Sequence, residues 1–263
     1  MPPLMRKPNI DLTAVLRLLE EFRDRIYEQS VGGIQVDRSL YAIVSMKLFG
    51  FAFNTYKAIG LLLPQHFYEQ AGALYRTLWE TAANFEWISR DPEQRSHEFL
   101  NFTLIEHHKF LRNSIRTAKR NHDPDAVVQV AGELRDFEAT VGRELREFQS
   151  IDRKGKLKWR YRFSGPSLET VIHEIGGEWL DEYDRDYHLG STYAHGAPAG
   201  ILFPLEHNPE LTELWDLERS ALMGVLAIRV MIRCDRLWLS FCGTNDEPYL
   251  SELFFRLRNC ATT

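Results

Sequence analysis

The sequence contains few cysteines and no long uncharged hydrophobic run. Cys234, Cys242 and Cys260 include no CxxC pair, which argues against a zinc knuckle or a disulfide framework and fits a reducing cytoplasm. The N-terminus lacks the apolar core of a signal peptide. The most apolar long stretch, residues 220–232, is interrupted by Arg229, so it is too short and too charged to span a bilayer. These absences predict a soluble, cytoplasmic protein that does not associate with membranes.

The sequence also lacks an excess of positive charge. Its 32 Lys and Arg against 37 Asp and Glu give a net charge of −5, so no overall basic field attracts nucleic acid or anionic lipid. It contains no Gly-rich phosphate loop, and the Glu-x-x-His pattern of di-iron bundles is missing. We therefore assign no metal site, with a metal held by His195 and Glu80 as the weaker alternative. The sequence identifies no cofactor.

Apolar residues recur at helical spacing along most of the chain. Asp11, Asp91-Pro92 and Asp123-Pro124 are typical of helix starts, because Asp can cap and Pro suits the first turn. We expect an all-α fold, an antiparallel bundle of roughly nine helices with no convincing sheet and an irregular insert near 150–166. The expected helices are 11–29, 37–62, 65–89, 92–120, 124–149, 167–175, 180–195, 212–242 and 246–258.

The same pattern predicts a single helical domain over residues 1–263. In this domain residues 37–242 form the core bundle, and residues 1–36 and 243–263 add peripheral helices.

The expected helix 65–89 carries an apolar face and, opposite to it, Arg76 and Glu80 one turn apart. Ala73 and Ala83 flank this pair, and Asn84 lies a turn beyond Glu80. Small neighbours allow a second helix to approach closely, so we expect this helix to be covered on both sides. Buried charges are costly unless they are paired, so the pair needs a structural or functional reason.

The expected helix 180–195 places Tyr183, Tyr187, Ser191 and His195 four residues apart on one polar face. Hydroxyls together with an imidazole are typical of a lined cavity. His195 is a candidate general acid or base or an anion contact, and Ser191 is close enough to hydrogen-bond it. In the alternative, His195 caps the helix C-terminus and the tyrosines pack.

On the expected helix 212–242, Arg229 and Arg233 continue a line of apolar residues, so we expect them to be partly buried. They would pair with Glu80 or bind an anionic ligand. The alternative, which we favour slightly, is an internal Arg–Glu network that fixes helix register.

Basic and aromatic residues alternate along residues 153–163, the only nucleic-acid-like feature of the sequence. We expect the stretch to form a short strand or an extended arm. It would contact nucleic acid, or its rings would pack on the bundle or across a dimer interface. The acidic net charge favours packing.

Two stretches of the sequence resemble the signatures of a bacterial family catalogued as domain of unknown function 5677. The first is the run 74–84, followed by Trp87 and Asp91-Pro92, and the second is the run 164–168, followed by the face from Tyr183 to His195 and Gly196. The family often has Trp before the Ser-Gly of the second signature, where this chain has Phe163. The resemblance covers roughly residues 40 to 240. It implies a helical fold in which the Arg–Glu and Ser–His faces meet, and it implies no reaction.

The sequence therefore predicts a helical bundle with an internal polar pocket that binds, and as an enzyme processes, a small anionic or phosphate-containing group. His195 would be the acid–base residue, Glu80 would orient it or accept a proton, and the arginines would stabilise negative charge. A phosphodiester-cleaving version would be a helical ribonuclease-like defence or toxin protein. The alternative is a non-enzymatic interaction or homo-oligomeric regulatory protein whose network is structural. The expected pocket residues are Arg76, Glu80, Asn84, Tyr183, Tyr187, Ser191, His195, Arg229 and Arg233.

Overall fold

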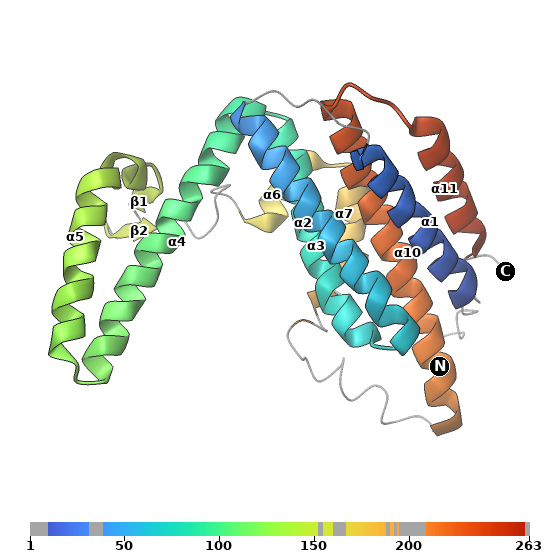
Figure 1. Ribbon diagram of the computed structural model, residues 1–263, viewed down its shortest axis with the longest axis horizontal. Helices are drawn as coiled ribbons and strands as arrows, with labels where there is room; N and C mark the ends of the chain where they lie inside the picture. The colour runs from blue at the N-terminus through green and yellow to red at the C-terminus, as the bar shows by residue number, and fades with distance from the viewer. Residues whose placement is uncertain are drawn as a thin grey trace. The chain divides into compact units, whose positions relative to one another are not determined.

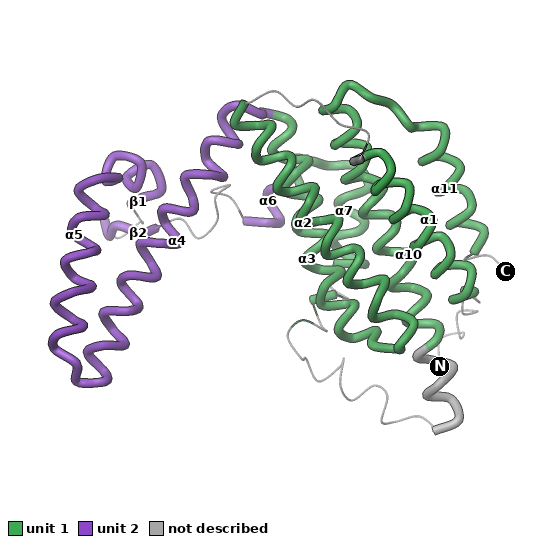
Figure 2. Tube along the Cα trace, in the orientation of Figure 1, with its two compact units in different colours: residues 1–90, 172–263 green, residues 91–171 purple. Residues whose placement is uncertain are grey.

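The computed structural model describes residues 10–31, 39–151, 155–159, 167–187, 190–191, 194 and 209–260. The chain divides into two compact units, shown in Figure 2: unit 1 comprises residues 1–90 and 172–263, and unit 2 comprises residues 91–171. Almost all described elements are helices, which confirms the all-α fold class. The single domain over residues 1–263 stays a prediction.

Unit 1 is a bundle of long helices that lie side by side in Figure 1. The helix α10 packs on α1, α2 and α3, and α2 also packs on α3. The short helix α6 (Leu168–Ile175) leads into this unit. The other elements of unit 1 are α1 (Leu12–Val31), α2 (Leu40–Leu62), the 3-10 turn η1 (Leu63–Gln65), α3 (Tyr68–Ser89), α7 (Glu178–Glu182), the π-helical turn η2 (Tyr183–Tyr187), α10 (Pro209–Phe241) and α11 (Glu247–Cys260).

Unit 2 is a helical hairpin of α4 (Pro92–Arg120) and α5 (Pro124–Glu147), followed by two short strands. The strands β1 (Gln149–Ile151) and β2 (Leu157–Trp159) pair antiparallel. The strand β2 lies in the basic-aromatic stretch for which a short strand was one expectation, whereas β1 and the pairing were not predicted. The core of this unit is a cluster of Ile105, Leu145 and Phe148, against which Trp159 packs from β2.

Two of the predicted helix starts, at Asp11 and Asp123, are confirmed by their caps. The carboxylate of Asp11 accepts a hydrogen bond from the Thr13 amide at 2.9 Å, and that of Asp123 accepts one from the Ala126 amide at 3.0 Å. Asp91 precedes α4 as predicted, but its side chain makes no capping hydrogen bond. The start expected at Asp37 lies outside the described residues; α2 begins at Leu40, and the Ser39 hydroxyl caps it.

The continuous α-helix expected over residues 180–195 is wrong. The helix α7 begins at Glu178, and after Glu182 the backbone widens into η2. A π-helical turn inserts one extra residue into a helix and is frequent at functional sites. The four-residue spacing of the polar face therefore does not follow a regular α-helix through this stretch.

Close contact between α10 and α1 depends on Gly224. A Cβ atom at this position would lie 2.5 Å from Val15 Cγ1 and 3.3 Å from Leu63 Cδ1. Val15 and Leu63 are both fully buried, so neither has free space into which to move. Only glycine lets the two helices approach this closely.

We predict that Gly224→Ala lowers the free energy of unfolding by about 1–2 kcal/mol, because overpacking outweighs the helix propensity gained. The measurement is urea unfolding followed by circular dichroism. The matched control is Gly50→Ala on α2, where a Cβ atom meets nothing within 4 Å, so stability should stay equal or rise. A Gly224→Ala variant as stable as Gly50→Ala would contradict the close approach.

Candidate functional site

The helix α3 is covered on both sides, as its sequence predicts. The helices α2 and α10 pack on one side. On the other side, residues within 174–187 and 190–191 bind polar groups of α3: the Arg90 guanidinium donates to the Glu174 carbonyl at 2.8 Å, and the Trp179 indole donates to Glu86 Oε2 at 2.5 Å. This second layer brings Tyr187 and Ser191 to Arg76 and Glu80.

Four predicted residues form one hydrogen-bonded group, the Arg76 cluster: Arg76, Glu80, Tyr187 and Ser191. Arg76 Nε donates to Glu80 Oε1 at 3.0 Å, and Arg76 Nη1 donates to Ser191 Oγ at 3.2 Å. The Tyr187 hydroxyl donates to the same Glu80 Oε1 at 2.8 Å. The side chains of Arg76 and Glu80 remain 22% and 30% exposed, so the pair is partly buried and still reached by solvent.

Protonation in the Arg76 cluster follows from burial and from these contacts. Burial and the hydrogen bond to Glu80 raise the pKa of Tyr187 to about 12. Burial opposes the charge of Arg76, but its contacts with Glu80 and Tyr187 outweigh this effect and raise the guanidinium pKa. At neutral pH the cluster therefore contains a neutral phenol that donates and a positively charged arginine.

Gly190 allows residues 190–191 to approach α3. A Cβ atom on Gly190 would lie 3.1 Å from Arg76 Cβ and 3.1 Å from the Gly72 carbonyl oxygen. This contact places Ser191 within reach of Arg76. Gly190 was not among the pocket residues expected from the sequence.

Aromatic rings lie beneath the cluster. Tyr183 and Tyr187, both in η2, stack with centroids 5.1 Å apart and planes inclined by 16°. The centroid of the Tyr187 ring also lies 4.9 Å from that of the fully buried Trp79. The Arg76 guanidinium carbon lies over the Tyr187 ring, 5.3 Å from its centroid. Tyr183 therefore joins the site through ring packing, and η2 presents the Tyr187 hydroxyl to Glu80.

Arg229 and Arg233 belong to a separate network around Glu182. The Glu182 side chain is 3% exposed and accepts from Arg229 Nη2 at 2.7 Å and from Arg233 Nη1 at 2.6 Å. Arg233 also binds Glu178 at 2.8 Å and lies over the Trp179 ring at 4.6 Å. The two arginines thus pair with acidic residues of α7, whereas the sequence analysis offered Glu80 as their partner.

Among the predicted residues that the structure describes, Asn84 lies apart from these networks. Asn84 Oδ1 is buried and has no hydrogen-bond partner among the described residues. His195, the predicted acid–base residue, lies outside the described residues.

The basic-aromatic stretch contributes one ring to the core of unit 2. The Trp159 ring lies 4.7 Å from that of His108, whose Nε2 is 2.8 Å from Glu138 Oε1. This arrangement agrees with the packing alternative for Trp159. Of the other residues in 153–163, positions 153–154 and 160–163 lie outside the described residues.

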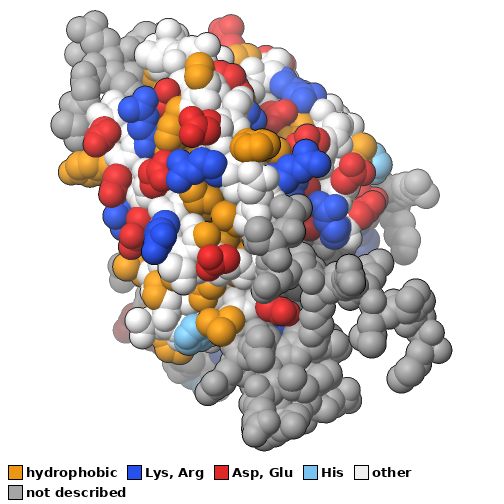
Figure 3. Space-filling model, turned by 90° about the vertical axis from the view of Figure 1, so that its right-hand side faces the viewer, with side chains coloured by type: hydrophobic (Ala, Val, Ile, Leu, Met, Phe, Trp, Pro, Cys, Tyr) orange, Lys and Arg blue, Asp and Glu red, His pale blue; other side chains and the backbone are white. Residues whose placement is uncertain are grey.

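The charged side chains on the surface bear on whether the protein has a highly charged binding face. On the face drawn in Figure 3, acidic and basic side chains intermingle and form no patch of one sign. Arg25 and Asp246 pair at 2.9 Å, and Arg256 and Glu21 pair at 2.6 Å.

In the described ranges no three or more His, Cys, Asp and Glu side chains come together as metal ligands. Among the helices of the described residues, none is both long enough and apolar enough to cross a bilayer.

One further titratable group, Asp235 of α10, is fully buried. Neither of its carboxylate oxygens has a hydrogen-bond partner among the described residues. Burial, with a smaller contribution from Asp246, raises its pKa to about 7, and Arg25 opposes this shift. The unpaired carboxyl group therefore makes the stability of the bundle depend on pH.

The comparisons with known proteins give one match. The sequence model of a family described as a family of unknown function, DUF5677, matches residues 42–210. This range includes the Arg76 cluster and confirms the resemblance seen in the sequence, although the match ends at residue 210 whereas the resemblance extended to about 240. No curated protein matches the chain, and no solved structure does.

We predict that Glu182→Gln lowers the free energy of unfolding by about 3–5 kcal/mol, because it removes the buried carboxylate that binds both Arg229 and Arg233 and leaves them only the exposed Glu178 and the more distant Asp186. Glu80→Gln should cost about 1 kcal/mol, since its site is partly exposed and the amide oxygen still accepts hydrogen bonds. Urea unfolding measures both, with Arg236→Gln, which breaks the exposed Arg236–Glu247 pair, as the control within about 1 kcal/mol of wild type. Equal losses at Glu182 and Glu80 would contradict the distinction between the two networks.

We predict that Asp235 makes stability fall as the pH rises. The unfolded chain loses this proton near the ordinary pKa of 3.8, whereas the folded chain keeps it up to about 7. Between these values the unfolded state binds fewer protons, so wild type should lose on the order of 4 kcal/mol relative to Asp235→Asn. Unfolding free energies of both proteins at pH 4, 5.5, 7 and 8 test this, and parallel pH profiles would refute it.

Proposed function

The chain belongs to DUF5677, a protein family of unknown function, and we propose a function from the site itself. We propose that the Arg76 cluster binds a small anionic or phosphate-containing group. Arg76 and Ser191 hold an oxygen of this ligand, and Glu80 accepts a proton or a hydrogen bond from it.

The observation that carries the proposal is the unused hydrogen-bonding capacity around Glu80 and Ser191. Among the described residues, both hydrogen bonds to Glu80 end on Oε1, and Oε2 accepts none. Ser191 Oγ accepts from Arg76 and donates no hydrogen bond there. An acceptor and a donor are therefore available on either side of a guanidinium, which has five N–H donors and favours planar anions.

As an enzyme, the site would use His195 as the general acid or base, while Glu80 orients it or takes up the proton. Arg76 would stabilise the negative charge that develops on the ligand. The Glu182 network supports a positioning role for Arg229 and Arg233, because both guanidinium groups already bind acidic side chains. With RNA as ligand, the same chemistry would be phosphodiester cleavage.

A second candidate function is a non-enzymatic interaction or homo-oligomeric regulatory protein. Large apolar side chains on α2 favour it: Met46, Phe51 and Leu61 are 52%, 53% and 74% exposed. In this case both Arg–Glu networks serve only to hold the helices in register.

The deciding experiment is thermal unfolding of the full chain with inorganic phosphate, pyrophosphate or adenosine monophosphate. A probe at about 100 times its Kd should raise the midpoint by roughly 5–11 °C. Arg76→Lys and Ser191→Ala should remove most of this rise, because they lose the planar fork and the hydroxyl. Glu80→Gln should keep the rise or enlarge it, since it removes a negative charge beside the anion.

Glu252→Gln, an exposed substitution on α11, is the matched control and should behave as wild type. A labelled RNA oligonucleotide tests cleavage in parallel, with Glu80→Gln and His195→Ala as the inactive variants. If no probe raises the midpoint, or if Arg76→Lys and Ser191→Ala respond as wild type does, the binding proposal fails and the interaction function is favoured.

A further inference from the structure

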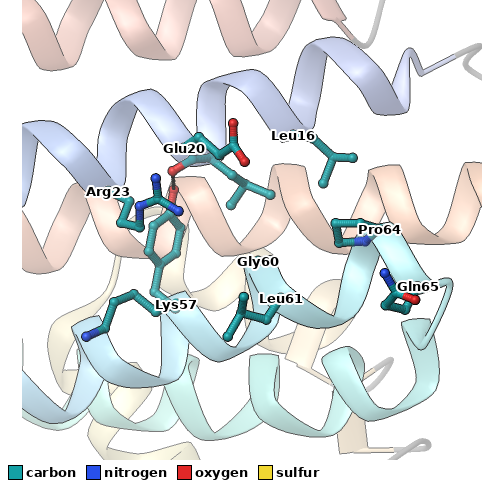
Figure 4. Close-up of a pocket in the computed structure, with 10 residues that line it drawn as sticks. Leu16, Glu20, Arg23, Lys57, Gly60, Leu61, Pro64 and Gln65 are labelled. Atoms are coloured by element: carbon teal, nitrogen blue, oxygen red, sulfur yellow. Dashed lines mark hydrogen bonds between the residues drawn. The ribbon is translucent and has the colours of Figure 1, made fainter.

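A groove opens between α1 and α2, which pack only lightly on one another: α1 packs mainly on α10, and α2 packs mainly on α3 and also on α10. The groove encloses about 520 Å³, and Figure 4 shows the side chains along it. This volume lies within the range of about 300–1,000 Å³ typical of small-molecule sites. The lining residues of this α1–α2 groove are Leu16, Leu19, Glu20, Arg23, Tyr56, Lys57, Gly60, Leu61, Pro64 and Gln65.

The body of the groove is apolar and has room for a ligand. Leu61 is 74% exposed, so its apolar side chain is open to contact with a ligand. A Cβ atom on Gly60 would meet nothing within 4 Å. The Tyr56 hydroxyl already donates to the Leu19 carbonyl at 3.1 Å, so it does not require a polar ligand. An aliphatic or aromatic group therefore matches this part of the groove.

One end of the groove carries two cations. Arg23 and Lys57 lie at the same end in Figure 4, whereas Leu16 and Pro64 lie at the other. Arg23 binds Asp24 at 2.8 Å, but the two side chains are 41% and 63% exposed, and such surface pairs contribute little and exchange readily. Glu20 also lines the groove, so a ligand with several negative charges would be repelled.

The length of the groove argues against a partner helix. On α1 its lining runs from Leu16 to Arg23, which corresponds to about 10 Å at the helical rise of 1.5 Å per residue. A docked helix uses anchors over three turns or more, and the groove offers about two. We propose that the α1–α2 groove binds a small amphipathic anion, with its apolar body on Leu61 and Pro64 and a single carboxylate near Arg23 and Lys57.

Decanoate below its micellar concentration is the test ligand, and decanol is its uncharged counterpart. Calorimetric titration of the full chain should show saturable one-to-one binding of decanoate. Decanol should bind about tenfold more weakly, because it lacks the charge that Arg23 and Lys57 recognise. Arg23→Gln and Lys57→Gln should weaken decanoate about tenfold and leave decanol unchanged. Lys47→Gln, also exposed on α2, is the matched control.

Two glycines of α2 provide a second, independent pair of variants. Both Gly60 and Gly50 have open space at the Cβ position, but only Gly60 lines the groove. Gly60→Leu should fill the groove and abolish decanoate binding, whereas Gly50→Leu should leave it unchanged. Circular dichroism confirms that each variant folds.

Three results would overturn the proposal: no saturable binding, equal binding by Gly60→Leu and wild type, or equal affinity for decanol and decanoate. Light scattering during the titration adds a fourth, because dimer formation would identify a second copy of the chain as the occupant. The groove shares no residue with the Arg76 cluster, so either proposal can fail while the other stands.

Discussion

The carboxylate of Glu182, held between Arg229 and Arg233, is the interaction on which the site depends. Glu182 is 3% exposed and belongs to α7, whereas both arginines belong to α10, so the contact fixes a short helix on a long one. A buried ion pair of this kind adds little net stability compared with apolar side chains of equal volume, but it is costly to break and therefore selects one register. That register places Trp179 on Glu86 and the Tyr187 hydroxyl on Glu80. We infer that the network's main contribution is positional.

The two Arg–Glu groups differ in what remains unsatisfied. Around Glu182, both carboxylate oxygens accept from guanidinium groups, and the acidic and basic charges balance. Around Glu80, both hydrogen bonds from the described residues end on one oxygen, and the Glu80 side chain is 30% exposed, against 3% for Glu182. A closed, desolvated network suits positioning, while a partly solvated group with an unused acceptor suits exchange with a ligand. This difference is why the proposed function rests on the Arg76 cluster and not on the larger group of arginines.

Part of this arrangement could be predicted from the sequence. The alanines beside Arg76 and Glu80 indicated a close second layer, and the shared face of Tyr187 and Ser191 indicated what that layer presents. The acidic partner of Arg229 and Arg233 could not be predicted, because it depends on which helix packs against α10. In the sequence, Glu182 does not differ from the other polar residues of a regular helix. The π-helical turn could not be predicted from the sequence either, because no residue pattern requires it. A short strand was one expectation for the stretch that contains β2, but its pairing with β1 was not predicted, because each strand has only three residues.

Glycines allow close approach at two places in the bundle. At Gly190 the absent side chain lets the backbone reach α3, and this approach brings Ser191 to Arg76. At Gly224 it lets α1 settle on α10, with Val15 against the glycine. The packing of α1 on α2 is lighter, and the groove that ends at Arg23 and Lys57 lies between them. The Arg76 cluster therefore depends on a close contact that a single methyl group on Gly190 would disturb.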